Sequence, residues 1–442
     1  MLLEPPPPPP PPQESKKTAL DEKYEGMTEP NHNCYSENGN IASNTHKSQT
    51  PPLLQPPRDT HTPSRRLGEL LKGINVPGDS ETAPEEPPWL DKHLFETGRR
   101  FYKKFLFCLN FSELLTLVLV LCQGRVLKPL VFTGRSDTPA VARRRYFSTL
   151  LHLISWFEGD VWDKTAPSHK DLMGVRRTHL RYGKSFNSPG MREKVLRVSV
   201  EDRGHPKSNK GIEPSIDTTK RIQTLTEASE EDSTVFISQL DMALTQYSFM
   251  GLILAHPGQL GAAAATEEEF KGLVHFWRGL GWLLGIKDQF NFCSGSVEET
   301  RELCLEVERH IFLPRLSEAN WDYEHMVDCL ISGIGQFLPM LSLPAMFKYL
   351  SYTLDIPTPS LSRRMSWRHV LQYWMMRFTF GAIYYYPKCL VKLNVWFRRV
   401  IHKVLVNDRL NLLAYRKGQA DLAVPLKDFE GYGVSRCPFS VG

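Results

Sequence analysis

The sequence predicts an all-α protein that follows a disordered, proline-rich N-terminal arm. From residue 89 onward, aromatic and aliphatic side chains recur every three or four positions, which is the period of an amphipathic helix. Alternating Val, Ile and Thr of the strand type are almost absent there. Eighteen of the 33 prolines fall within the first 88 residues, where large apolar side chains are few. We therefore predict a disordered arm at 1–88 and one all-α domain at 89–442.

The periodicity places helices at 91–110, 111–123, 139–156, 168–182, 235–256, 267–284 and 297–309, with several more between 321 and 406. Three of them have capping signals. Asp91 precedes a periodic run, Ser168 has Asp171 three positions later, and Thr266 precedes three glutamates that oppose the helix dipole. Residues 194–233 turn polar and acidic, which predicts an exposed loop within the domain.

Composition limits the classes of function. The net charge of the 442-residue chain is only +5, so no nucleic-acid partner is predicted. The eight cysteines include no CxxC pair, which indicates reduced thiols in place of a disulfide framework or a zinc site. The N-terminus lacks the apolar core of a secretory signal, so we expect an intracellular protein, either cytoplasmic or associated with an internal membrane.

Three segments suggest contacts with partners. The run of eight prolines at 5–12 favours polyproline II and could bind an SH3- or WW-type domain, or serve only as a spacer. Residues 105–121 and 330–352 are apolar but are interrupted by polar residues and prolines. We interpret both as core helices, with contact to a membrane surface, or a span, as the alternative.

Two short segments carry candidate chemistry. His179 and Arg176 are three residues apart on one predicted helix, and Arg145 and Thr149 share one face of another. An imidazole beside guanidinium groups suits haem, because the iron takes an axial nitrogen ligand and the propionates bind arginine. The competing interpretation is that these are ordinary polar helix surfaces. His275, in a Gly-rich apolar helix, is a second possible iron ligand.

These residues occur in an order that resembles a known family. The motifs are Arg145-x-x-Ser148-Thr149, Arg176-x-x-His179, the segment 239–246 (QLDMALTQ) and the segment 276–286 (FWRGLGWLLGI). Together they are similar to the mpaB / rubber-oxygenase (latex-clearing-protein) catalytic domain, over roughly residues 130–406. The 276–286 segment resembles uncharacterised arthropod members most closely.

The resemblance implies a globin-like helical bundle that holds haem b. The family's axial histidine falls on His179, and its pocket residues fall on Arg145, Thr149 and Arg176. His275 is then assigned to the core. A lysine that can cap the distal iron site in rubber-cleaving members is replaced here by Ser148. The implied activity is an oxygenase that uses dioxygen on a hydrophobic, isoprenoid-like substrate, with Arg145 or Thr149 stabilising the negative charge that develops.

Two other readings compete with the oxygenase. A di-iron carboxylate bundle needs Glu-x-x-His pairs on two helices, and the helical region offers only Asp322-x-x-His325. A non-catalytic all-α protein could keep the fold and bind partners through its proline-rich arm. A measurement of bound haem distinguishes the two, because only the oxygenase is expected to bind it.

Overall fold

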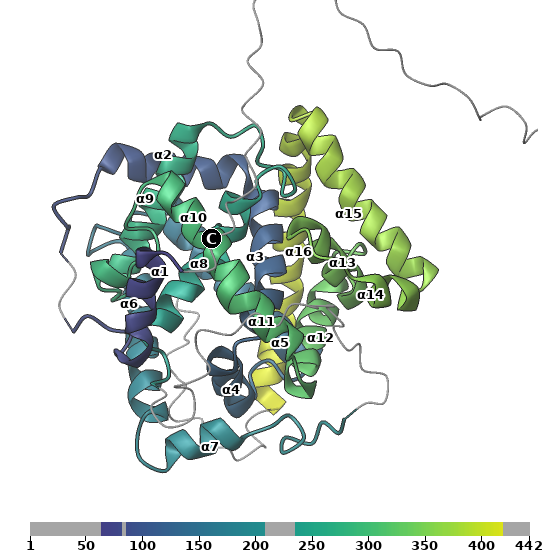
Figure 1. Ribbon diagram of the computed structural model, residues 1–442, viewed down its shortest axis with the longest axis horizontal. Helices are drawn as coiled ribbons and strands as arrows, with labels where there is room; N and C mark the ends of the chain where they lie inside the picture. The colour runs from purple at the N-terminus through teal and green to yellow at the C-terminus, as the bar shows by residue number, and fades with distance from the viewer. Residues whose placement is uncertain (1–62, 82–84, 208–234, 419–442) are drawn as a thin grey trace, which may run out of the picture. The chain divides into compact units, whose positions relative to one another are not determined.

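The structure is a computed structural model of the chain, and it describes residues 63–81, 85–207 and 235–418. The all-α prediction is confirmed. The described residues form helices joined by turns and loops, and their β-structure is limited to an isolated bridge between Pro77 and Ser238. The described helices belong to one compact unit that starts at Thr60 (Figure 1).

In chain order the α-helices are α1 (Arg65–Leu71), α2 (Lys92–Lys104), α3 (Leu106–Val120), α4 (Gly124–Thr133), α5 (Pro139–Glu158), α6 (Pro167–Phe186), α7 (Met191–Arg197), α8 (Gln239–Ala255), α9 (Glu267–Leu283), α10 (Val297–Val307), α11 (Leu313–Ser317), α12 (Trp321–Gly335), α13 (Leu343–Thr353), α14 (Pro359–Arg364), α15 (Trp367–Tyr385) and α16 (Lys388–Gly418). Two short 3₁₀ helices, η1 (Lys72–Asn75) and η2 (Asp288–Phe290), and one π-helical turn, η3 (Glu308–Phe312), complete the set. Two of the predicted caps are confirmed, because Asp91 caps α2 and Thr266 forms a capping box with Glu269 at the start of α9.

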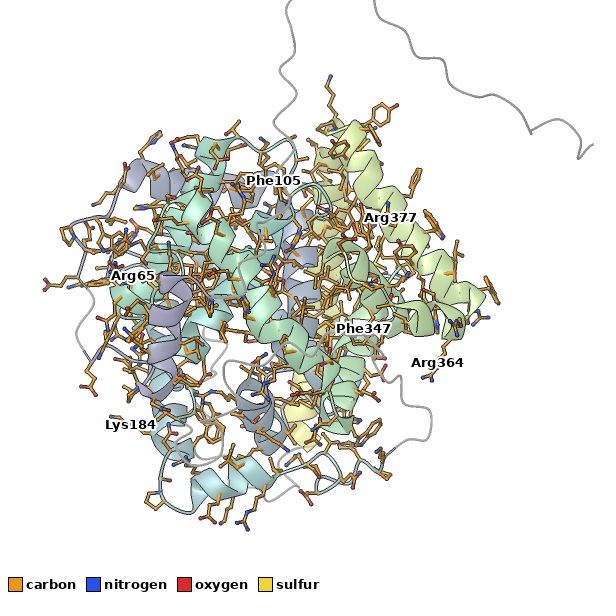
Figure 2. All side chains as sticks on the ribbon, in the orientation of Figure 1. Arg65, Phe105, Lys184, Phe347, Arg364 and Arg377 are labelled. Atoms are coloured by element: carbon orange, nitrogen blue, oxygen red, sulfur yellow. The ribbon has the colours of Figure 1, made fainter. Side chains whose placement is uncertain are left out.

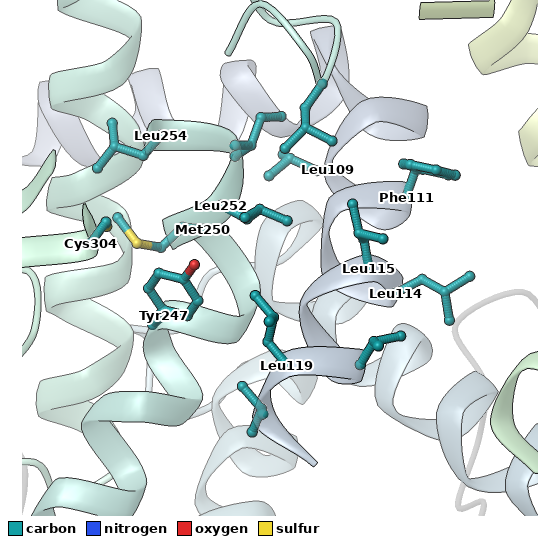
Figure 3. Close-up of a cluster of buried hydrophobic side chains, with 14 of the residues drawn as sticks. Leu109, Phe111, Leu114, Leu115, Leu119, Tyr247, Met250, Leu252, Leu254 and Cys304 are labelled. Carbon is teal, nitrogen blue, oxygen red and sulfur yellow. The ribbon is translucent and has the colours of Figure 1, made fainter. Parts of the chain in front are cut away.

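Helices α3 and α8 form the centre of the core. Twelve of the fifteen residues of α3 and fifteen of the seventeen of α8 are buried, as expected of helices that are apolar on all sides. Figure 3 shows leucines of α3, such as Leu115, beside α8 residues that include Met250 and Leu252. Burying one such side chain stabilises the fold by about 1.5–3 kcal/mol.

The boundary between α2 and α3 differs from the prediction. The helix expected at 91–110 ends at Lys104, and α3 starts at Leu106. Asn394 of α16 stabilises the break, since its side chain accepts a hydrogen bond from the backbone N–H of Phe107 at 3.0 Å and donates one to the carbonyl of Lys104 at 2.8 Å. The amide that satisfies this break comes from almost 290 residues further along the chain, so the local periodicity does not reveal it.

The two apolar segments that raised the question of membrane contact are core segments in the structure. Within the described residues, no single helix has the length and hydropathy of a membrane span. Helices α3 and α4 satisfy the criterion only together, and they meet at a bend of 97°. The segment 330–352 is divided between α12 and α13, with residues 336–342 between them.

Helices α2 and α9 approach each other most closely at two glycines. A Cβ added to Gly272 would lie 2.7 Å from the backbone nitrogen of Gly98, and a Cβ on Gly98 would overlap the carbonyl oxygen of Gly272. Three further glycines of the Gly-rich segment, Gly279, Gly281 and Gly285, also face protein atoms. Their neighbours include the side chains of Phe95 and Gln246, so these glycines serve packing within the chain.

A Gly98→Ala substitution should therefore lower the free energy of unfolding by about 1–3 kcal/mol, because backbone atoms cannot move aside as a flexible side chain can. Gly68→Ala in α1 is the matched control, since its new Cβ would meet no atom within 4 Å. Alanine at residue 68 should be neutral or stabilising by up to about 1 kcal/mol, through helix propensity. Urea unfolding of both variants measures the difference, and equal stabilities would contradict the close packing.

The C-terminal part of the predicted arm is folded, which corrects the domain boundary at residue 89. Ser64 caps α1, and Leu67 and Leu70 of that helix are buried in the core. The compact unit therefore begins near residue 60. The sequence signal for this helix was a serine followed by two leucines three residues apart. The prolines around it gave the segment the composition of a linker, so the helix was not predicted. The rest of the arm, including the proline run, lies outside the described residues.

The predicted loop at 194–233 begins later than expected. Helix α7 occupies Met191–Arg197, and Asp322 of α12 fixes the residues after it by accepting hydrogen bonds from the N–H of Val200 and from Lys128, both at 2.8 Å. Lys128 also donates to the carbonyl of Val198 at 2.6 Å. Residues 208–234 of the predicted loop are outside the described part of the chain.

Candidate functional site

The predicted site residues lie on α5 and α6, two twenty-residue helices in contact with each other. Helix α5 starts as expected, with Thr138 as its cap and Pro139 in its first turn. Helix α6 starts at Pro167, and its cap residue makes no side-chain hydrogen bond. The predicted Ser168 cap is wrong, because the Ser168 hydroxyl donates to the carbonyl of Asp160 at 2.6 Å.

Helix α5 is partly accessible along most of its length. No residue from Val141 to Gly159 is fully exposed, yet the helix buries only four residues completely, and all ten from Arg143 to His152 stay half-buried. An ordinary amphipathic helix has one exposed face and one buried face. In α5 the partly accessible residues between Arg143 and His152 are consecutive, so no single face of this stretch is fully buried.

His179 of α6 is the most chemically distinctive residue of the predicted set. Its Nδ1 is buried, with no hydrogen-bond partner within the described part of the chain, while the ring as a whole keeps some accessible surface. Burial, together with smaller effects of the positive charge of Arg145 and of the imidazole of His152, lowers the pKa of His179 to about 4. At neutral pH the imidazole is therefore uncharged, which is the form that binds a metal.

Arg145 and Thr149 are both half-buried on α5. The effect of Arg145 on the pKa of His179 puts its guanidinium within electrostatic range of that ring. The Thr149 hydroxyl donates to the carbonyl of Arg145, one turn earlier, at 3.3 Å. Ser148, which stands at the expected lysine position, is half-buried beside them. The structure thus brings Arg145 and His179 together across α5 and α6.

Arg176 has a structural partner that the sequence did not suggest. Its guanidinium forms two hydrogen bonds of 2.8 Å to the carboxylate of Asp79, and both side chains are about nine-tenths buried. Burial alone would raise the pKa of Asp79, but the hydrogen bond from Arg176, the backbone N–H of Glu81 and the charge of Arg176 together outweigh it and hold that pKa below its usual value. Asp79 lies in the segment assigned to the arm, so the pair joins that segment to α6.

Sequence reasoning also missed a connection between α5 and α6. The Asp171 carboxylate accepts hydrogen bonds of 2.9 Å from Nδ1 of His152 and from the indole of Trp156. One α6 carboxylate thereby holds two α5 rings that are one turn apart. The sequence interpretation had assigned Asp171 to the Ser168 cap, and it gave no role to the His152–Trp156 pair on the other helix. This contact positions His152, whose charge acts on His179.

The remaining motif residues have structural roles. His275 is half-buried, at the edge of the core, and accepts a hydrogen bond from the backbone N–H of Asp91 at 2.9 Å. Gln246 donates to the carbonyl of Trp277 at 2.8 Å and accepts from the N–H of Phe292, so the 239–246 segment holds the turn after α9 in place. The contacts of Gln246 give that residue of the 239–246 motif a structural role.

The residues of the di-iron alternative are occupied elsewhere. Asp322 bonds Lys128, as described above, and Nε2 of His325 is 2.8 Å from the carbonyl oxygen of Asp137. No group of three or more His, Cys, Asp or Glu side chains that could hold a metal ion occurs in the described ranges.

Comparison of the chain with protein-family models, with curated proteins and with solved structures found no match.

Proposed function

We propose that this protein is a haem b-dependent oxidoreductase, an oxygenase that uses dioxygen on a hydrophobic substrate, with His179 as the axial iron ligand. The observation that carries the proposal is a buried imidazole that is uncharged at neutral pH and whose Nδ1 lacks a hydrogen-bond partner among the described residues. A buried polar atom without a partner is uncommon and calls for an explanation, such as an absent group. The proposal includes the globin-like bundle and the membership of the rubber-oxygenase family implied by the motifs.

The residues of α5 and α6 fit haem in part. His179 would hold the iron, and Arg145 offers a positive charge near it for a propionate or for an anionic oxygen species. Thr149 already bonds the backbone of its own helix, although a hydroxyl can also donate elsewhere by rotating. Arg176 fits less well, because Asp79 satisfies its guanidinium, so its assignment to the propionates stays a prediction.

Bound haem supplies a redox-active iron that can react with dioxygen. The chain's own contribution is to bind and orient it. The low pKa of His179 keeps its ring in the ligating form, and Arg145 provides fixed positive charge where negative charge develops. Ser148 is much shorter than the lysine of the rubber-cleaving members, so it leaves more space beside the cofactor. The hydrophobic substrate is proposed from the resemblance of the motifs to the rubber-oxygenase family.

One observation favours the alternative of a non-catalytic all-α protein. The Asp79–Arg176 pair occupies an arginine that haem would otherwise use, and an occupied arginine is compatible with a scaffold that keeps the fold without the cofactor. In that case the proline-rich arm would carry the function through an SH3- or WW-type partner.

The deciding experiment is an absorption spectrum of the full chain produced with haem supplied, beside His179→Ala and the control His93→Ala, which removes an exposed imidazole of α2. We expect a Soret band in the parent and in His93→Ala, and loss or displacement of that band in His179→Ala, with helical content by circular dichroism unchanged in all three. A folded, helical parent that takes up no haem would overturn the proposal and favour the scaffold.

A further inference from the structure

Exposed large apolar side chains gather in one stretch of the chain. Thirteen large apolar side chains are exposed in the described part of the chain, and all of them lie between residues 352 and 396. Three of the largest are Trp367, Trp374 and Phe378, which are 72%, 57% and 78% exposed. Scattered exposed hydrophobic residues are normal on soluble proteins, whereas a contiguous cluster marks an interaction surface.

The cluster has the geometry of an amphipathic helix. Trp367, Leu371, Trp374, Phe378 and Tyr385 follow one another along α15 at spacings of four, three, four and seven residues, so they share one side of the helix. We call this stripe the aromatic face. The opposite side of α15 is buried and packs on α13. In Figure 2 the side chains on the outer side of α15 project away from the other described helices.

The surroundings of the aromatic face are strongly basic. Between residues 356 and 407 the sequence contains nine Lys and Arg and no Asp or Glu, whereas the whole chain has a net charge of only +5. Arg363 and Arg364 lie at the end of α14, Arg368 lies in the first turn of α15, and Lys388 and Lys392 lie at the start of α16. All five are exposed, so the charge is available to a partner.

A shallow, open pocket adds a basic site on α16. It is lined by Val395, Arg398, Arg399 and His402. Arg398 also forms an ion pair of 3.2 Å with Glu158, and both side chains are partly exposed. Guanidinium groups beside an apolar side chain suit a phosphate that is attached to a hydrocarbon chain, because they bind the anion while the apolar side chain contacts the rest.

We propose that α15 and the first part of α16 dock this protein on the surface of an anionic phospholipid bilayer. The aromatic face enters the headgroup region, where Trp and Tyr are favoured, and the surrounding Lys and Arg contact lipid phosphates. Helix α15, about 28 Å long, lies in the plane of the surface. No described helix meets the criterion for a span, which is compatible with surface docking.

Charge decides between a membrane and a second copy of the chain. A symmetric dimer through this face would oppose two segments that each carry nine positive charges and no negative charge, so like charges would repel. An anionic bilayer instead complements both the charge and the aromatic side chains. The inference goes beyond the proposed function and does not depend on haem, since the exposed surface belongs to the polypeptide alone.

The test is flotation of the full chain with vesicles of phosphatidylcholine, and of phosphatidylcholine with 30 mol% (about one third) phosphatidylserine, at near-physiological salt. We expect strong binding to the anionic vesicles and a blue shift of tryptophan fluorescence upon binding. Trp374→Ser with Phe378→Ser should abolish the binding. Lys388→Glu with Lys392→Glu should weaken it by about fivefold per lysine removed, since each basic residue near the surface contributes about 1 kcal/mol.

Lys103→Glu with Lys271→Glu is the matched control, because it makes the same change at two exposed lysines of α2 and α9. Its vesicle binding should equal that of the parent. Three results would overturn the proposal. The parent could bind neutral and anionic vesicles equally, it could bind neither, or the two double-lysine variants could lose vesicle binding to the same extent. A stable dimer in solution that the Trp374 and Phe378 substitutions dissociate would overturn it as well, by assigning the face to a second copy.

Discussion

Replacing Asp79 by alanine is expected to lower the free energy of unfolding by about 3–5 kcal/mol, because it leaves the buried guanidinium of Arg176 without its counter-charge. The pair is bidentate, with both hydrogen bonds at 2.8 Å, and the two side chains are 9% and 10% exposed. An uncompensated charge at that depth cannot recover its lost hydration from solvent. Urea unfolding of the full chain at neutral pH measures the change.

The control is Glu69→Ala, which removes the partner of Lys72 in an exposed ion pair of α1. Solvent screens an exposed pair of this kind, so this variant should unfold almost as the parent does. An apolar replacement of both members, Asp79→Leu with Arg176→Met, should cost much less than Asp79→Ala alone. If Asp79→Ala and Glu69→Ala lowered the free energy of unfolding by similar amounts, the buried pair would contribute little to stability.

The same variants bear on Arg176 as a possible partner of haem propionates. If Arg176 serves only Asp79, the double apolar variant should keep the haem content of the parent. If it also contacts a propionate, the double variant should lose haem although it is folded. Stability and haem content together therefore separate a structural role from a binding role.

The fold class followed from the sequence because helical periodicity and capping are local properties. The helices at 139–156 and 267–284 were located to within about two residues, since Thr266 caps the latter directly. Where prediction failed, the cause was tertiary. The break at Phe105 depends on Asn394, and the close contact of α2 with α9 depends on two glycines that are far apart in sequence. A sequence window contains only one partner of each such contact.

The sequence predicted which residues form the candidate site better than it predicted the contacts that those residues make. His179 and Arg145 could be proposed from motif order, and the structure places them within electrostatic range of each other. The partner of Arg176 could not, because Asp79 lies in a segment whose composition is that of a linker. The contact of Asp171 with His152 was likewise invisible, since nothing in either helix specifies how α5 and α6 are rotated against each other.

Without haem, the protein should lose stability as the pH falls from about 6.5 to about 4, partly because of His179. The pKa of this histidine is about 4 in the folded chain, against 6.5 in the unfolded chain. The unfolded chain therefore binds a proton in that window and the folded chain does not, so lower pH favours unfolding. The shift corresponds to about 3 kcal/mol at pH 4.

His179→Phe should remove this contribution, so the difference in unfolding free energy between parent and variant should change by about 3 kcal/mol between pH 7 and pH 4. His93→Phe, at an exposed residue, is the control, and its pH profile should parallel that of the parent.

Glu113 should have a pH dependence of stability opposite to that of His179. Burial raises the pKa of its carboxyl well above the usual value, so the stability associated with it is lost as pH rises. The free energy of unfolding of Glu113→Gln should therefore rise relative to that of the parent at high pH. For His179→Phe it should rise relative to the parent at low pH. Parallel pH profiles for the parent and His179→Phe would mean that His179 is solvated, and would remove the main physical argument for a cofactor at that ring.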